Sequence, residues 1–159
     1  MLRWITTAVL AMMLATLAAC AEPEGPRTTE RLVIETASGD QIFNIEFAET
    51  EDERRRGLMF REDLAEDSGM LFDFEDSRVI TMWMRNTPLP LDMIFIIRTG
   101  RIAHIAENTV PFSEAIISSR YPVSAVLEVN AGTARRLGIT TGDLVRHSVF
   151  EDAPPAAAE

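Results

Sequence analysis

The chain has 159 residues and a formal net charge of −10, a length that suits one domain with one hydrophobic core. Its acidity disfavours nucleic acid as a partner, because a nucleic-acid-binding surface needs an excess of basic side chains. All of its basic residues are arginines, which excludes Schiff-base chemistry and phosphate binding by a Walker-type lysine.

The chain begins with a short apolar run from Trp4 to Ala19 that follows a single arginine, Arg3. The run is shorter than the roughly 20 residues that span a bilayer, and small residues precede Cys20, as a signal peptidase requires. The string Leu17-Ala18-Ala19-Cys20 resembles a bacterial lipobox. We therefore expect residues 1–19 to be a signal peptide and Cys20, the only cysteine, to be the lipidated first residue of the mature chain.

Cleavage after Ala21 is the alternative, because Ala19-Cys20-Ala21 also fits the small-x-small rule, and it would give a soluble periplasmic or secreted protein. We prefer the lipoprotein, since a leftover thiol is a liability in an oxidising compartment. Ala21 in place of aspartate resembles the sorting pattern of Gram-negative outer-membrane lipoproteins. The expected location is therefore the cell envelope, at the outer membrane facing the periplasm, with the membrane as a partner through the lipid anchor.

Next comes a segment, residues 20–30, with two prolines and no apolar periodicity, which predicts a flexible tether. Residues 151–159 are predicted to be a disordered tail. A single β-rich domain is therefore expected over residues 31–150.

The domain opens with two predicted strands, 31–36 and 41–47, which turn residues between them should join as a hairpin. Thr50 to Glu53 form a capping box that predicts a short helix, with Arg54 to Arg56 at its end and Gly57 after it. The arginine run is interpreted as a helix terminus, where basic side chains are favourable. An anion-binding patch is the alternative.

Six further strands follow, with a tight turn at Thr99-Gly100 between the third and the fourth. Asn130 is expected to cap a second helix over 131–137, and Gly138 to end it in the left-handed conformation. The six strands are 69–74, 79–84, 93–98, 101–107, 125–129 and 143–150. About eight short strands with two small helices predict a mainly β (α+β) fold, as a compact barrel or sandwich.

The most unusual block runs from Met82 to Phe95, where a strand enters a two-proline loop and leaves directly into another strand. The prolines fix φ and bias the residues before them toward extended geometry, so the loop should be stiff. Alternation along the incoming strand should place Trp83 and Arg85 on one face and Met82 and Met84 on the other.

This block resembles the bacterial and archaeal family called domain of unknown function 192, through the string Trp-Met-x-Asn-Thr-Pro-x-x-Leu-Asp. The likeness covers most of residues 31–148. Further matching segments are Arg56-Gly57-Leu58-Met59, Gly69-Met70-Leu71-Phe72, Val126-Leu127-Glu128-Val129, Leu137-Gly138-Ile139 and Gly142-Asp143. The resemblance implies a compact, mostly β fold that is often exported and has no established activity.

Asp92 is the most provocative single residue, since an unpaired carboxylate at the mouth of an apolar strand would be costly. We prefer a scaffold role, with hydrogen bonds from backbone amides of residues 86–91 or a pair with Arg85. In the functional alternative, Arg85, Asn86 and Asp92 are a polar rim that holds a ligand beside Trp83. These four are the candidate binding residues.

A Met82-x-Met84 pair beside a tryptophan suggests a Cu(I) site, with His104 as a further ligand. Ordinary core packing is preferred, because methionine fills cores and alternation readily turns both residues inward. No metal and no cofactor is therefore predicted, and an exported copper-handling module remains an alternative.

Enzyme interpretations are weaker, and no catalytic residue is assigned. The chain has no Gly-x-Ser-x-Gly elbow, only two histidines, His104 and His147, and a cysteine that belongs to the signal junction. Asp92 and Glu128 remain as a candidate pair of glycosidase carboxylates.

The sequence thus predicts a lipid-anchored envelope protein whose domain binds a small ligand, such as a saccharide, or another envelope protein, without catalysis. A hydrolase of envelope glycans is the alternative from another class. In a third interpretation the central block is a rigid hub, and the partner surface lies elsewhere.

Overall fold

The computed structural model describes residues 29–150. The predicted signal peptide, the lipidated Cys20, most of the tether and the tail lie outside this range. Among the described residues, no helix has the length and apolar character needed to cross a membrane.

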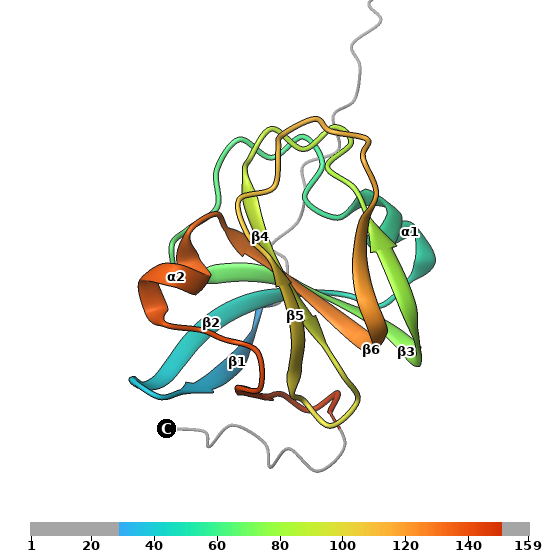
Figure 1. Ribbon diagram of the computed structural model, residues 1–159. Coiled ribbons are helices and arrows are strands. Elements are labelled where there is room, and N and C mark those ends of the chain that lie inside the picture. The colour runs from blue at the N-terminus through green and yellow to red at the C-terminus, as the bar shows by residue number, and fades with distance from the viewer. Residues whose placement is uncertain (1–28, 151–159) are drawn as a thin grey trace, which may run out of the picture.

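Seven strands form one curled sheet, a half-barrel, in the order β5-β4-β6-β3-β2-β1-β7 (Figure 1). Neighbouring strands are antiparallel except β2 and β3, which are parallel. The bounds are β1 Thr29–Thr36, β2 Gly39–Ala48, β3 Ser68–Met82, β4 Leu91–Ile96, β5 Ile102–Ala106, β6 Ile117–Asn130 and β7 Leu144–Arg146. The mainly β prediction is confirmed, with a single curled sheet as its form.

Two of the predicted strands are in fact one. Segment 69–74 and most of segment 79–84 belong to β3, which ends at Met82 and whose pairing with β6 shifts register between Asp73 and Arg78. The intervening Glu75 has a φ of 60°, so the strand bends there without ending. The polar residues between the two apolar segments resemble a turn in composition, which is why the sequence suggested two strands and about eight in all.

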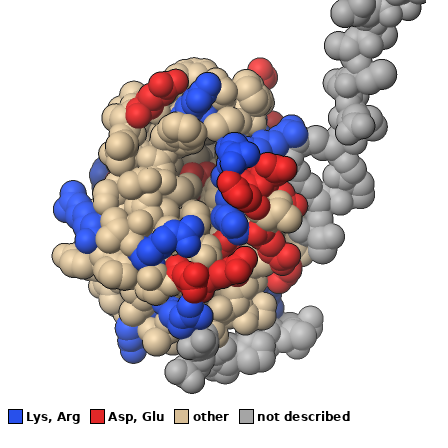
Figure 2. Space-filling model, turned by 90° about the vertical axis from the view of Figure 1, so that its right-hand side faces the viewer, with Lys and Arg blue, Asp and Glu red and all other residues tan. Residues whose placement is uncertain are grey.

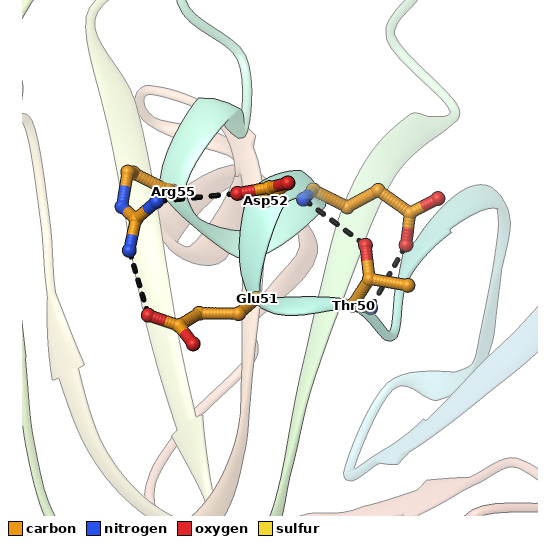
Figure 3. Close-up of polar contacts among 5 residues, drawn as sticks. Thr50, Glu51, Asp52 and Arg55 are labelled. Carbon is orange, nitrogen blue, oxygen red and sulfur yellow. Dashed lines mark hydrogen bonds and ion pairs between the residues drawn. The ribbon is translucent and has the colours of Figure 1, made fainter.

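The first helix, α1 (Glu51–Arg56), follows the prediction. Thr50 accepts a hydrogen bond from the Glu53 amide, and the Glu53 carboxylate accepts one from the Thr50 amide at 2.9 Å, which completes the capping box (Figure 3). Gly57 ends the helix with a φ of 48°, and a Cβ there would lie 3.0 Å from the Phe72 ring. Both the backbone conformation and the space therefore favour glycine.

The second helix, α2 (Thr133–Leu137), begins differently from the prediction. Gly132 stands at its N-cap without a side-chain cap, while Asn130 donates instead to the Leu64 and Ala65 carbonyl oxygens. Asn130 is paired with Leu91 in the sheet, two residues before the N-cap residue Gly132, so its side chain does not cap the helix. Gly138 ends the helix in the left-handed conformation, with a φ of 68°, as predicted.

Buried side chains pack on both faces of the sheet. One face carries mainly Leu, Ile and Val side chains, including Ile94 and Leu127, together with Ala134 of α2. The other face is rich in Met and Phe, including Phe72 and Met93, together with Leu58 that follows α1. We call these the α2 face and the α1 face, and the two helices lie at opposite sides of the sheet (Figure 1).

Candidate functional site

Three of the four candidate binding residues come together on the surface. Trp83, Arg85 and Asn86 line one hollow of about 370 Å³. Trp83 is 45% exposed, and the Arg85 guanidinium lies 5.6 Å from the centre of its ring. Met84 between them is completely buried, as predicted, but Met82 lines a hollow together with Trp83 and does not share the environment of Met84, because β3 ends at Met82.

A second hollow of about 400 Å³ adjoins the first, since both are lined by Arg55, Arg56, Met59 and Trp83. We call the two together the Trp83 groove. Its second hollow reaches the α1 face of the sheet, where apolar side chains form its walls: Leu58, Phe72, Phe74 and Met82. The groove therefore places an exposed aromatic ring beside a hollow whose walls are partly apolar and partly charged, a combination found in ligand sites.

Asp92 does not belong to the groove. It is completely buried on the α2 face, where one carboxylate oxygen accepts from the Asn108 amide and the other from the Ala134 amide, both at 2.9 Å. Ala134 lies in the first turn of α2, so Asp92 satisfies a helix amide that Gly132 leaves without a side-chain cap. The predicted donors, in residues 86–91 and Arg85, were wrong, but this geometry is that of a scaffold residue.

Glu128 occupies the mirror position on the other face. In the pairing of β4 with β6, Asp92 lies opposite Val129 and Met93 lies opposite Glu128. Because paired residues share a face and successive residues alternate, the Asp92 and Glu128 carboxyl groups point to opposite sides of the sheet. The suggested pair of glycosidase carboxylates is therefore wrong.

The Glu128 side chain lines the second hollow of the Trp83 groove, although the residue is only 4% exposed. Within residues 29–150 no hydrogen bond or ion pair holds its carboxyl group. Burial raises the pKa of this carboxyl from 4.5 to about 8, because the charged form loses its hydration. Glu128 is thus a neutral acid at pH 7, with its hydrogen-bonding capacity unused and facing a cavity.

Four arginines line the same hollow. Arg54, Arg55, Arg56 and Arg78 line the second hollow, and among the described residues of its lining Glu51 is the only other acid. Figure 2 shows this side of the molecule, where basic and acidic side chains gather over α1 beside a hollow in the surface. The groove is locally positive on a strongly acidic chain.

The arginine run thus ends α1, as predicted, and at the same time borders the groove. Arg54 donates to the Asp73 carbonyl oxygen at 2.8 Å and lies over the Phe74 ring, which fixes the helix against β3. Arg55 is exposed and pairs with Glu51 at 2.6 Å and with Asp52 at 3.2 Å (Figure 3). Arg54 is therefore structural, while Arg55 reaches solvent at the opening.

The methionines have two environments. The Met84 sulfur is sealed in the core and accepts a hydrogen bond from the Thr109 hydroxyl at 3.1 Å, whereas Met59 and Met82 line the groove. His104 stacks on Phe95, and burial together with Arg120 lowers its pKa. In the described part of the chain no group of three or more His, Cys, Asp or Glu side chains could hold a metal ion.

Sequence reasoning named Glu128 only as half of a pair and missed its position in the groove. The available signal was a single acid inside the otherwise apolar segment Val126 to Val129. Alternation could have placed it on the face opposite Leu127 and Val129. The hollow above it could not be foreseen, because it is built by α1 and by the residues after β3.

Comparison with known proteins agrees with this fold. The family described as DUF192, Uncharacterized ACR, matches residues 33–147. A crystal structure of a protein from Sinorhizobium meliloti 1021, named as a proposed transcription regulator, is similar at 51% identity with a TM-score of 0.74, over 77% of this chain and 96% of that one. A protein of unknown function from Novosphingobium aromaticivorans DSM 12444 is similar at 40% identity with a TM-score of 0.76, over 79% of this chain and 89% of that one. No curated protein matches the chain.

Proposed function

The chain belongs to the uncharacterised DUF192 family, and from that premise we propose that its domain is a non-catalytic binding module that holds a small ligand in the Trp83 groove. The observation that carries the proposal is Glu128, a buried carboxyl group that faces the groove without a hydrogen-bond partner among residues 29–150. A buried polar group is costly unless it is satisfied. A ligand in the groove supplies the missing partner.

The remaining features of the groove support binding rather than turnover. Trp83 offers an apolar surface, and Arg85 and Asn86 offer orienting polar groups beside it. Hydrolysis by two carboxylates is disfavoured, because Asp92 points to the other face and Glu51 is an exposed helix residue already paired with Arg55. A role in transcription, as in the name of the similar Sinorhizobium protein, is disfavoured by the net charge of −10.

We also propose that this module is a lipoprotein of the cell envelope, anchored through Cys20. The support is the lipobox-like Leu17-Ala18-Ala19-Cys20 together with the absence of any other cysteine. Replacing Cys20 with Ser in the full chain should move the protein from the membrane fraction to the soluble fraction. Retention of the C20S variant on the membrane would contradict the anchor.

A second candidate function is docking of another envelope protein. Phe60 and Phe112 are 71% and 64% exposed, and both have positive φ. Their amides donate to the carbonyl oxygens of Asn86 and Thr87, so the two rings flank the two-proline loop. Exposed apolar groups held in costly backbone conformations favour an interaction surface at this end of the molecule.

The primary test uses Trp83, which is the only tryptophan of residues 21–159. That segment contains the whole described domain, with its core on both faces of the sheet. We would titrate it with saccharides, peptidoglycan fragments, small amphiphiles and Cu(I), and follow the tryptophan emission. A saturable change in Trp83 emission that the E128L variant lacks supports ligand binding in the groove. Emission that stays unchanged with every compound contradicts it.

A further inference from the structure

The charge and shape of the groove indicate the chemical class of its ligand, an inference that rests on the binding function proposed above. We propose that the Trp83 groove takes a small amphipathic anion, whose apolar part packs on the groove walls and whose carboxylate or phosphate group lies among the arginines. An acceptor atom of the same head group binds to the Glu128 carboxyl.

The walls select for an apolar body. The apolar side chains that line the second hollow and are not fully buried are Met59, Phe74, Met82 and Trp83. The guanidinium groups of Arg54 and Arg78 lie 5.7 and 5.6 Å from the centre of the Phe74 ring. A purely polar ligand would leave these surfaces in contact with water. An apolar chain or ring gains about 25 cal/mol for each Å² that it removes from water.

The rim selects for negative charge. The two hollows together are lined by five arginines, and among the described lining residues the opposing exposed acids are Glu51 and Asp52, which both pair with Arg55. The five arginines are Arg54, Arg55, Arg56, Arg78 and Arg85. A cationic ligand would meet like charges at the opening, whereas carboxylate and phosphate groups suit the fork of N–H donors on a guanidinium.

Glu128, which lines the second hollow of the groove, also favours a negatively charged head group. A neutral carboxylic acid has one O–H to donate, and within residues 29–150 no acceptor takes it. An anionic oxygen is the strongest acceptor for such a donor, since charge-assisted hydrogen bonds are roughly twice as strong as neutral ones. The base and the rim of the groove are therefore complementary to the same kind of head group.

The experiment compares four unbranched ligands with ten carbon atoms each: decanoate, decyl phosphate, decanol and decylamine. Binding to residues 21–159 is followed by Trp83 emission and by calorimetry. We expect decanoate or decyl phosphate to bind at least about tenfold more tightly than decanol, and decylamine to bind least. The ratio between the two anions identifies the preferred head group, and decanol or decylamine binding as tightly as both anions would overturn the proposal.

Variants locate the contacts. R55A or R78A should each weaken anion binding about tenfold, whereas R136A, an equal charge change on α2 at the far side of the sheet, should change it less than about twofold. If R136A weakens binding as much as R55A, the attraction is a general charge effect, and the rim assignment is wrong.

Glu128 is tested by pH. The charged or titratable groups that face it across the hollow are Glu51, Arg54, Arg55, Arg56 and Arg78, and the arginines keep their charge throughout. From pH 6 to pH 9, decanoate stays ionised while Glu128 loses its proton, so binding should weaken about tenfold. E128Q keeps a donor without titrating and should bind equally at both pH values. A tenfold loss that persists in E128Q would exclude Glu128 as the donor.

The outcomes separate the two proposals. Saturable binding of decanol or of a neutral saccharide, but of neither anion, keeps the groove as a binding site and removes only the ligand class. No response to any compound, in the wild type and in E128Q alike, removes the binding function itself.

Discussion

Asp92 and Glu128 are two buried carboxyl groups on neighbouring strands, and the sheet separates them. Asp92 on the α2 face has a backbone amide for each oxygen, from Asn108 and Ala134. Glu128 on the α1 face has no partner within residues 29–150 and opens to a cavity. Burial alone therefore does not assign a role to an acid, and the partners of its oxygens separate a satisfied scaffold residue from a candidate site residue.

The largest effect is expected on the scaffold side. D92A should lower the free energy of unfolding by about 4 kcal/mol, because it removes two hydrogen bonds to a charged acceptor and leaves two amides unsatisfied. Urea denaturation measures the loss. A D92A protein as stable as the wild type would show that the Asp92 carboxyl does not stabilise the fold, and the contrast with Glu128 would be lost.

On the site side the expected change has the opposite sign. Between pH 4.5 and about 8 the unfolded chain releases the Glu128 proton while the folded chain keeps it, so unfolding becomes easier as pH rises. E128Q lacks this penalty and should be more stable than the wild type by about 3 kcal/mol at pH 7. This stability difference between E128Q and the wild type should vanish near pH 4. An equal difference at pH 4 and pH 7 would contradict a neutral Glu128 in the folded chain.

A smaller effect is expected from weakening α1, which tests whether this helix shapes the groove without stabilising the rest of the fold. T50A removes the capping box and should cost about 1 kcal/mol. Because the helix carries three of the groove arginines, T50A should also weaken decanoate binding. Amide hydrogen exchange should accelerate in α1 and stay unchanged in α2. Faster exchange in both helices would show that the two faces of the sheet do not unfold independently.

The smallest effect concerns the surface pair of Arg85 and Glu114, whose charged atoms lie 3.7 Å apart with both side chains more than half exposed. E114Q should change the stability by less than about 0.5 kcal/mol, as is typical of exposed ion pairs. It frees the Arg85 guanidinium beside Trp83, so anion binding should improve slightly. A loss of binding in E114Q would show that Glu114 orients Arg85.

Local signals made much of this fold predictable. The capping box of α1, the Gly138 helix end and the outward direction of Trp83 and Arg85 follow from neighbouring residues, and all are confirmed. The scaffold role preferred for Asp92 agrees with its geometry. Its actual donors were not predictable, because Ala134 lies 42 residues away and reaches Asp92 only through the curl of the sheet.

The errors have the same physical origin. The residues around Asn130 predict that it caps a helix, but its pairing with Leu91 keeps it in β6. The break expected after residue 74 is a bend, because β6 continues to pair across it. Glu128 was undervalued for a similar reason, since its cavity is formed by segments that are distant in sequence.

The meeting of the sheet's two edges sets the order in which the domain can fold. β7 pairs with β1, and Arg101 beside β5 bridges to Leu144, so the contacts that close the sheet join the first and last parts of the domain. Such distant contacts have a high loop-closure entropy and form slowly. The sheet can therefore close only when almost all of residues 29–150 are available. The bridge between Arg101 and Leu144 covers part of the edges that β5 and β7 would otherwise leave free for pairing with another chain.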